Sequence, residues 1–499
     1  MKFNDNTYYI SPEIVSHGKV GYVVEPDVKE IVEGNSTSHT LNDYSRFLQP
    51  GWLKGECAAF LKILSSSTIQ ELNNEQSGGI LVWPHSFNIG KDDLTKRKVL
   101  ECTFDNEYKK IKTLSTNNLV GFVGKGKVQV EINTRFCSNK DKEQDYYLYY
   151  MLSKVFHLNI VNMEVGSGSL KELDLLIFMF PRLLQDAMRQ GLYKQYVKRE
   201  YNDCNIRGTI DVSRHLRLNY PSNGRIAYRT REFSYDNYVT QLIRHTIEHV
   251  ARHPMGAALL SESKEMEECV RNIVQNTPSY QKSAKRTVMA DNRKVVSHPY
   301  FTKYKALQQL CLAILRNERI SHGTQSDKVH GVLIDVAWLW EEYLAIVLSE
   351  VGFKHHTSQN SFKLFQNVDS ERCFQTVIPD YLHINNYVAD AKYIPLHRFE
   401  HLDAERAAAV YYKTIMYMYR FATSKGFLFH PCHANEVQDD ERIVNNVIRA
   451  DYMIANDKNC CLYKLGMVIP SANVFSDFVQ DIAEAEGNYV YEISKILNK

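Results

Sequence analysis

Two stretches of the sequence decide the expected fold and site: Val377-Ile378-Pro379-Asp380 and, ten residues after Asp380, Asp390-Ala391-Lys392. The chain between them is rich in residues that favour strands and is interrupted by Asn385-Asn386, a pair typical of a turn. We therefore expect a β-hairpin. Such a hairpin would bring two carboxylates and one ammonium group together.

The parity of the residue numbers predicts on which face these side chains lie, because successive strand side chains point to opposite faces. A three-residue loop from Asn385 to Tyr387 would pair residue 382 with 390 and residue 380 with 392, so that all three charged groups share one face. A two-residue Asn385-Asn386 loop would put Asp380 on the other face unless a bulge corrected it. The chemical interpretation therefore requires the longer loop or a bulge.

Two converging carboxylates suit Mg²⁺, which takes one or two acidic ligands and keeps positions for water and a phosphate oxygen. Asp380 and Asp390 are the expected metal ligands, and the carbonyl of Ala391 could add another. Lys392 would orient or help deprotonate a water molecule and would offset negative charge on a phosphoryl transition state. Together these residues predict the hydrolysis of a phosphodiester.

The flanking sequence predicts further elements. Apolar periodicity indicates helices at 331–351 and 403–423, and Phe427-Leu428-Phe429 reads as a strand. Strands at 444–454 and 462–469 and a closing helix at 474–497 are expected after them. Around the two acidic stretches, the expected order is helix, two or three strands, helix, strand.

This order and these residues resemble the PD-(D/E)xK nuclease superfamily and, more narrowly, the McrC family, the nuclease subunit of McrBC-type modification-dependent restriction systems. Three motifs carry the resemblance: Leu339-Trp340-Glu341-x-Tyr343-Leu344, Pro379-Asp380 and Asp390-Ala391-Lys392-Tyr393. Met416-Tyr417 is similar to part of the helix that follows, but Lys413 stands where related nucleases often have Gln. The likeness extends, with less specific motifs, over about residues 115–499.

The resemblance implies an αβββαβ core with its site on the central hairpin, Mg²⁺ as the cofactor, and the catalytic residues Asp380, Asp390, Lys392 and Glu341. Glu341 would be a further ligand, and the adjacent Glu342 is an alternative to it. The implied partners are double-stranded DNA and an AAA+ GTPase of the McrB type. In that family the GTPase recognises methylcytosine-containing DNA, while McrC stimulates GTP hydrolysis and cuts. We therefore expect a type IV restriction endonuclease subunit, which acts in phage defence.

The length of 499 residues allows two to four domains. We expect an α+β multidomain chain: a mixed or β-rich region at 1–100 of unknown role, a β-rich and then helical region at 101–325 for partner or DNA binding, and the endonuclease domain at 326–499. The ten cysteines are scattered, and neither a secretory signal nor a long apolar run is present. These features predict a cytoplasmic protein without membrane spans.

Positive charge gathers between Arg189 and Arg231, where ten Lys/Arg accompany three acids and five interleaved tyrosines. Cations and aromatic rings together suit a nucleic-acid surface, but a solvated face or a protein interface explains this stretch equally well. Further upstream, Gly124-Lys125-Gly126-Lys127 lacks the phosphate-loop pattern and is expected to be a hairpin turn. Any source of chemical energy must then lie in a partner.

Two alternatives to the nuclease hypothesis stay open. One is a non-catalytic assembly subunit that activates a GTPase and keeps a decayed nuclease fold. The other, less favoured, is a zinc hydrolase, because His245-Thr246-Ile247-Glu248-His249 fits the HxxEH pattern with Glu248 as general base. An amphipathic apolar stripe through the same helix favours a structural role for these histidines.

Overall fold

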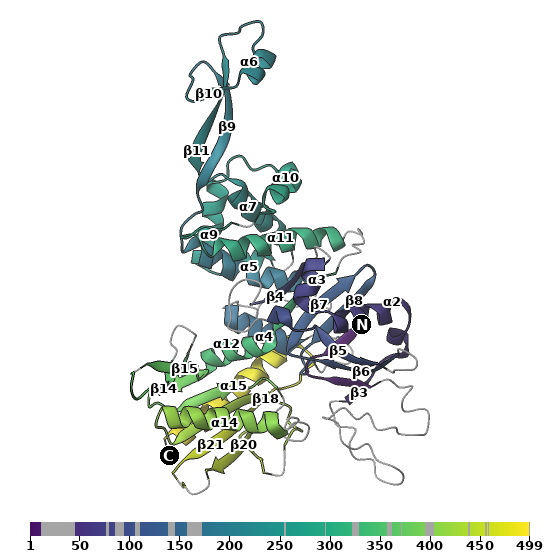
Figure 1. The fold of residues 1–499 in the computed structure, drawn as a ribbon, viewed down its shortest axis with the longest axis vertical. Coiled ribbons are helices and arrows are strands. Elements are labelled where there is room, and N and C mark those ends of the chain that lie inside the picture. The colour runs from purple at the N-terminus through teal and green to yellow at the C-terminus, as the bar shows by residue number, and fades with distance from the viewer. Residues whose placement is uncertain are drawn as a thin grey trace. The chain divides into compact units, whose positions relative to one another are not determined.

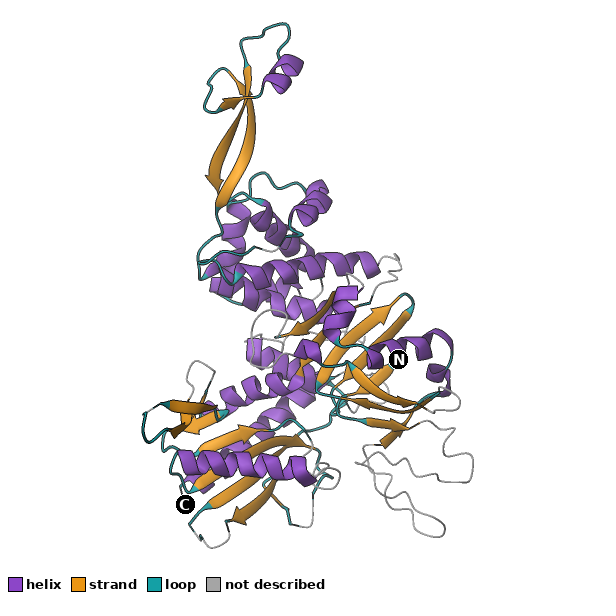
Figure 2. Ribbon diagram, viewed as in Figure 1, coloured by secondary structure: helices purple, strands orange, loops and turns teal. Residues whose placement is uncertain are grey.

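A computed structural model gives the fold of the chain, which is mixed α/β and multidomain, as expected (Figure 1; Figure 2). The structure describes residues 1–10, 45–75, 79–84, 94–104, 110–137, 145–156, 172–253, 256–294, 296–321, 329–356, 362–370, 372–394, 404–437, 440–454, 457 and 459–498. The chain divides into two compact units, one made of Met1–Glu172 with Gln325–Lys499 and the other of Leu173–Thr324. The expected boundary at residues 325–326 lies outside the described residues.

The first unit contains a five-stranded sheet that takes strands from both parts of its sequence. Its order is β1-β8-β7-β12-β4, and β12 lies antiparallel to β7 and parallel to β4. The strands are β1 (Lys2–Asn4), β4 (Gly79–Trp83), β7 (Leu119–Lys125), β8 (Val128–Asn133) and β12 (His330–Asp335). The turn between β7 and β8 contains Gly126 at a φ of +61°, so the predicted hairpin at 124–127 is confirmed.

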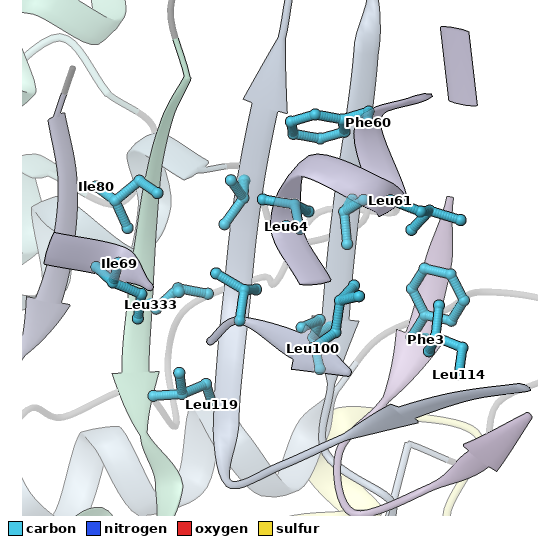
Figure 3. Packing of buried hydrophobic residues seen from close by; sticks show 14 of the residues in the cluster. Phe3, Phe60, Leu61, Leu64, Ile69, Ile80, Leu100, Leu114, Leu119 and Leu333 are labelled. Carbon is cyan, nitrogen blue, oxygen red and sulfur yellow. The ribbon is translucent and has the colours of Figure 1, made fainter. Parts of the chain in front are cut away.

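A four-stranded sheet and two helices complete the core of this region. The sheet order is β3-β2-β6-β5. The elements are β2 (Tyr8–Ile10), β3 (Ser45–Phe47), η1 (Pro50–Leu53), α2 (Gly55–Ser66), α3 (Ile69–Glu75), η3 (Leu94–Lys96), β5 (Leu100–Phe104) and β6 (Ile111–Thr116). Figure 3 shows Phe60, Leu61 and Leu64 of α2 in one buried cluster with Leu100 and Leu114 of the four-stranded sheet. The expected mixed, β-rich character of the first hundred residues is present in the described segments.

The helix expected from residue 331 begins five residues later, so that prediction was wrong at its start. Residues His330–Asp335 form β12, and α12 runs from Val336 to Ser349. The carboxylate of Asp335 accepts the Ala337 N–H at 3.1 Å and so caps the helix. A short apolar run fits a buried strand as well as a helix. Here β7 and β4 pair with the run on both sides, so it forms a strand.

The second large sheet of this unit has the order β13-β16-β17-β18-β21-β20-β19. Its strands are β13 (Phe353–His355), β16 (Tyr381–His383), β17 (Val388–Ala391), β18 (Lys425–Cys432), β19 (Arg442–Val444), β20 (Val447–Met453) and β21 (Cys461–Val468). A separate hairpin is formed by β14 (Phe362–Gln366) and β15 (Cys373–Val377). The predicted strands around 427–429, 444–454 and 462–469 are thus confirmed, the second of them as β20, which begins three residues later than expected.

Helices pack on this sheet. The described part of the expected second helix is α14 (Ala404–Arg420), which contacts β17 and β18, and the closing helix is α15 (Phe475–Leu497), which contacts β20 and β21. α12 contacts β13 and β17, and α4 (Tyr146–Phe156) packs against α12. Residue 403, the expected start of α14, is not among the described residues.

The hairpin β16–β17 has the three-residue loop that the parity argument required, but one residue earlier than expected. Tyr381 pairs with Ala389 and Leu382 with Val388, so the predicted pairing of residues 382 and 390 was wrong. The His383 N–H donates to the Tyr387 carbonyl at 2.8 Å, which leaves residues 384–386 as the loop. Asn386 takes a φ of +64°, the left-handed conformation that closes such loops.

The second unit is helical and carries a long antiparallel hairpin. Its elements are α5 (Glu172–Met188), β9 (Gln195–Asp203), β10 (Thr209–Ile210), α6 (Val212–Leu218), β11 (Ile226–Ser234), α7 (Tyr238–Val250), α8 (Gly256–Leu260), α9 (Lys264–Gln275), η4 (Lys282–Ala284), α10 (Lys285–Asp291) and α11 (Tyr304–Ser321). The hairpin β9–β11 extends from these helices, with β10 and α6 at its far end (Figure 1). The region 101–325 was expected to be β-rich and then helical, but a strand, β9, begins at Gln195 within its later part.

Candidate functional site

The predicted acids and lysine meet at the hairpin β16–β17. Asp380 directly precedes β16, Asp390 lies within β17, and Lys392 follows the end of that strand. The Ala391 N–H donates to Oδ2 of Asp380 at 2.9 Å, so the side chain of Asp380 reaches the backbone of the neighbouring strand. The structure therefore brings Asp380, Asp390, Ala391 and Lys392 into one cluster.

Asp390 is fully buried and is contacted by two ammonium groups. Nζ of Lys392 forms an ion pair with Oδ2 of Asp390, and Nζ of Lys413 lies 3.1 Å from Oδ1. Burial by itself raises the pKa of Asp390, but the two lysines outweigh it and lower that pKa to about 2. Asp390 is therefore a permanently ionised carboxylate at neutral pH.

Asp380 is buried as well, but its carboxyl group has a much higher pKa than that of Asp390. Burial raises the pKa of Asp380 to about 7, and the negative charge of Asp390 raises it further. A hydrogen bond between the two side chains contributes to both shifts. Near neutral pH, Asp390 is therefore ionised, whereas Asp380 is partly protonated. A cation bound at the pair would replace the proton of Asp380.

Glu341, the other predicted site residue, is on α12. Its backbone carbonyl accepts a hydrogen bond from the hydroxyl group of Tyr381, which ties α12 to β16. Burial raises the pKa of Glu341 well above its usual value, and the nearby charge of Asp380 adds to that rise. The neighbouring Glu342 instead lies 3.8 Å from Nδ1 of His355. The carboxyl group of Glu341 is thus electrostatically linked to the acidic pair.

Lys413 belongs to the site although the sequence identified it only as a departure from a family pattern. It lies on α14, and its Nζ is 5.4 Å from the ring centre of Tyr417, one turn further on. The Tyr417 hydroxyl donates to the carbonyl of Ile378 at 3.0 Å, which fixes this face of α14 against the chain entering Asp380. The position of Lys413, four residues before Tyr417, was visible in the sequence. The contact of Lys413 with Asp390 depends on how α14 packs on the sheet.

The donor set fits Mg²⁺. Asp380 and Asp390 supply carboxylate oxygens, and the carbonyl of Ala391, the residue after Asp390, accepts a hydrogen bond from Nζ of Lys392 at 3.2 Å. In the described residues, no three His, Cys, Asp or Glu side chains come together as a metal-holding group. A cation at this position would therefore have two acidic ligands, which is the number that Mg²⁺ uses when it keeps several waters.

The HxxEH residues lie on α7 in other surroundings. His245 is buried with its ring 4.7 Å from that of Tyr280, and Glu248 forms an ion pair with Arg244 at 2.7 Å. Burial is the main cause that lowers the pKa of both His245 and His249 to about 4. These contacts are those of a structural helix whose histidines stay neutral.

The positively charged stretch 189–231 forms much of the hairpin β9–β11, where several of its cations are paired with acids. Ion pairs join Arg199 to Glu232, Arg214 to Glu200, and Arg229 to both Glu200 and Asp211. Arg207 lies 3.9 Å from Asp203. Several of these cations are thus paired with the few acids of the hairpin, while contact of this stretch with DNA stays a prediction.

The fold and the site define a multidomain α/β protein with two buried acids at one hairpin and two lysines in contact with them. A family model described as "McrBC 5-methylcytosine restriction system component" matches residues 114–431, well over half of the chain. The chain therefore belongs to this family, as its motifs had suggested. No curated protein matches it.

Two solved structures are similar to the chain. One is a half-complex from the tetradecameric assembly of Thermococcus gammatolerans McrB AAA+ hexamers with bound McrC: identity is 14%, coverage is 89% of this chain and 96% of the other, and the TM-score is 0.43. The second is the cryo-EM structure of the T. gammatolerans McrBC complex, with 15% identity, coverage of 52% and 73%, and a TM-score of 0.25. No helix in the described parts of the chain is long and apolar enough to cross a membrane.

Proposed function

We propose that the chain is the Mg²⁺-dependent endonuclease subunit of a GTP-dependent restriction complex that acts on DNA containing 5-methylcytosine. One observation carries this proposal: Asp380, Asp390 and Lys392 converge on adjacent strands of a chain that belongs to the McrBC family. The family match gives the biological system, and the cluster of acids and lysine gives the chemistry. Together they support phosphodiester cleavage as part of DNA restriction.

The order of elements around the site supports the PD-(D/E)xK assignment. Along the chain it runs α12, β13, β16, β17, α14, β18, apart from the inserted hairpin β14–β15. The four strands are neighbours in the sheet, with β17 and β18 parallel. We take this succession of described elements to support an αβββαβ core with the acids on its central hairpin.

Each residue of the cluster has a role in the proposed hydrolysis. Asp380, Asp390 and the Ala391 carbonyl would hold Mg²⁺, which when bound polarises a phosphoryl oxygen. Lys392 would offset the negative charge that develops on the phosphoryl group and would orient the water whose oxygen forms the new bond to phosphorus. The phosphorus–oxygen ester bond breaks, and its oxygen leaves with a proton. Glu341, whose pKa is raised in part by the charge of Asp380, would act on the same cluster.

We also propose an AAA+ GTPase of the McrB type as partner, because the chain belongs to a family of components of the McrBC restriction system. The far end of the hairpin β9–β11 is the surface best suited to a protein partner. Its apolar side chains are 43–83% exposed: Ile206, Ile210, Val212, Leu216, Leu218 and Tyr220. Exposed apolar clusters of this kind are typical of protein interfaces rather than of phosphate-binding surfaces.

The partner surface is tested with the double variant Val212→Ser and Leu216→Ser, both on α6. We expect loss of binding to the GTPase and loss of GTPase stimulation. The matched control is Phe365→Ser with Phe374→Ser, which removes two similarly exposed apolar side chains from the hairpin β14–β15. Equal binding by the α6 variant and the control would remove this surface from the proposal.

The function itself is tested by incubating the full chain with its candidate GTPase, GTP and Mg²⁺ on methylated and unmethylated duplex DNA. We expect cutting of methylated DNA that needs every component. Stimulation of GTP hydrolysis without cutting would instead favour the non-catalytic assembly subunit. Absence of both activities would contradict the assignment.

A further inference from the structure

Lys413 contacts the most deeply buried acid of the site from a separate element. Asp390 is already paired with Lys392 on its Oδ2, and Lys413 takes the opposite oxygen, Oδ1, at 3.1 Å. The two lysines differ in access to solvent, since the side chain of Lys392 is 18% exposed and that of Lys413 is 43% exposed. A single carboxylate therefore has one enclosed and one accessible cation.

Lys392 alone can balance the charge of Asp390, so neutralisation of this acid does not by itself require Lys413. An ion pair with a half-exposed lysine adds little to stability, because water screens the lysine. The position of the Lys413 ammonium has a more direct consequence for the site. Both oxygens of Asp390 have a lysine partner, so a divalent cation bound by Asp380 and Asp390 would compete with one of the two lysines, and Lys413 is the more accessible of them.

We propose that Lys413 is a second phosphate-contacting cation of the nuclease site, which covers Asp390 before the metal binds and contacts a DNA phosphate in the loaded site. This inference rests on the proposed function. Tyr417, anchored to Ile378, keeps this face of α14 against the hairpin, so that the lysine stays at the site when it leaves Asp390. The flexible four-carbon stem of a lysine allows that change of partner, and the side chain of Lys413 is half-exposed, so a ligand that comes from solvent can reach it.

The first test measures Mg²⁺ binding to the full chain without DNA, by calorimetry. Lys413→Gln removes the competing charge and keeps a polar side chain of similar length, so we expect Mg²⁺ to bind roughly two- to fivefold more tightly than to the wild type. The matched control is Lys495→Gln on α15, where a 49% exposed lysine lies 4.0 Å from the fully buried Glu492. We expect no change in Mg²⁺ affinity for this control.

The second test measures the salt dependence of binding to methylated duplex DNA in Mg²⁺. A Lys392→Met background prevents cutting during the measurement. Adding Lys413→Gln should lower the slope of log affinity against log salt concentration by about 0.9, the value for one lost phosphate contact. Adding Lys495→Gln should leave the slope unchanged.

The outcomes separate this inference from the function on which it rests. If the wild type neither binds Mg²⁺ nor cuts DNA, the proposed function fails and the role of Lys413 fails with it. If the wild type does both and Lys413→Gln matches it in Mg²⁺ affinity and salt slope, the inference alone is overturned. Tighter Mg²⁺ binding with an unchanged salt slope would also overturn it, because Lys413 would then cover Asp390 without contacting DNA.

Discussion

The two aspartates of the site differ in charge because different groups surround them. Burying a carboxylate costs several kcal/mol unless donors or cations offset the loss of water. Asp390 has two lysines and stays ionised, whereas Asp380 receives a backbone N–H from Ala391 and has a pKa of about 7. A cation that binds both acids near neutral pH would displace a proton from Asp380, so binding of metal and release of a proton are coupled.

His245 leads to a prediction about pH at the scale of one residue. Burial first, and then the charge of Lys285, lower its pKa from 6.5 to about 4, so the folded unit holds this imidazole neutral. The folded state is stabilised by keeping His245 neutral, and this contribution is fully present above pH 6.5 and is lost as the pH falls toward 4. For one group the loss is at most about 1.4 kcal/mol per pH unit. Thermal unfolding of the wild type should therefore shift to lower temperature between pH 7 and pH 5.

In His245→Gln this pH-dependent shift should be smaller, although the variant is less stable at pH 7 because it loses packing against Tyr280. The measurement is the difference in Tm between the two pH values, not the Tm itself. An equal difference in wild type and variant would show that His245 is not the titrating group.

At the scale of elements, the loop of the β16–β17 hairpin depends on Asn386. Its φ of +64° lies in the left-handed region, which costs most residues about 1 kcal/mol and costs glycine almost nothing. Asn386→Ala should lower the free energy of unfolding by about 1 kcal/mol, and Asn386→Gly should leave it nearly unchanged. Urea denaturation checks both values. The control is Asn385→Ala, for which we expect the free energy of unfolding to change by less than about 0.5 kcal/mol. If Asn385→Ala lowered the free energy of unfolding more than Asn386→Ala did, the assignment of the turn would be contradicted.

Sequence reasoning predicted the length of this loop but not its place. If Asp380 and Asp390 are to share a face, the loop between the strands must have an odd number of residues. Where the loop lies depends on which asparagine takes the left-handed conformation. The same limit applies to the stretch 189–231, because charge counting could not foresee that cross-strand pairing sets Arg229 opposite Glu200. Residues 331–335 were misassigned since their strand partners come from distant parts of the chain.

At the scale of the whole first unit, Arg135 links the N-terminal sheet to strands β17 and β18. It follows β8, it is buried, and its Nη2 donates to the carbonyls of Tyr393 and Pro431, the latter at 3.2 Å. Its guanidinium lies 4.4 Å from the ring centre of Tyr393, and its backbone N–H donates to Asp5 at 2.6 Å. Since Tyr393 directly follows Lys392, the N-terminal region holds the backbone next to the proposed catalytic lysine.

We predict that Arg135→Met destabilises the first unit by about 2–5 kcal/mol, because two buried carbonyls lose their donor at about 1–3 kcal/mol each. Cutting of DNA should fall as well, through displacement of Lys392. Arg135→Lys, which keeps one charged donor, should recover part of both losses. Chemical denaturation and the cutting assay give the two readouts, with the exposed Arg442→Met as control. If Arg135→Met were as stable as the wild type, the N-terminal sheet and strands β17 and β18 would be held together without Arg135.

The central claim is that the acidic pair on the β16–β17 hairpin cuts DNA, and Asp390→Asn tests it most directly. The substitution keeps the size of the side chain and removes its charge. In the complete mixture with the GTPase, GTP, Mg²⁺ and methylated DNA, the account predicts that cutting by the variant falls at least about a hundredfold while its stimulation of GTP hydrolysis is kept. Cutting at the wild-type rate by Asp390→Asn would contradict the account.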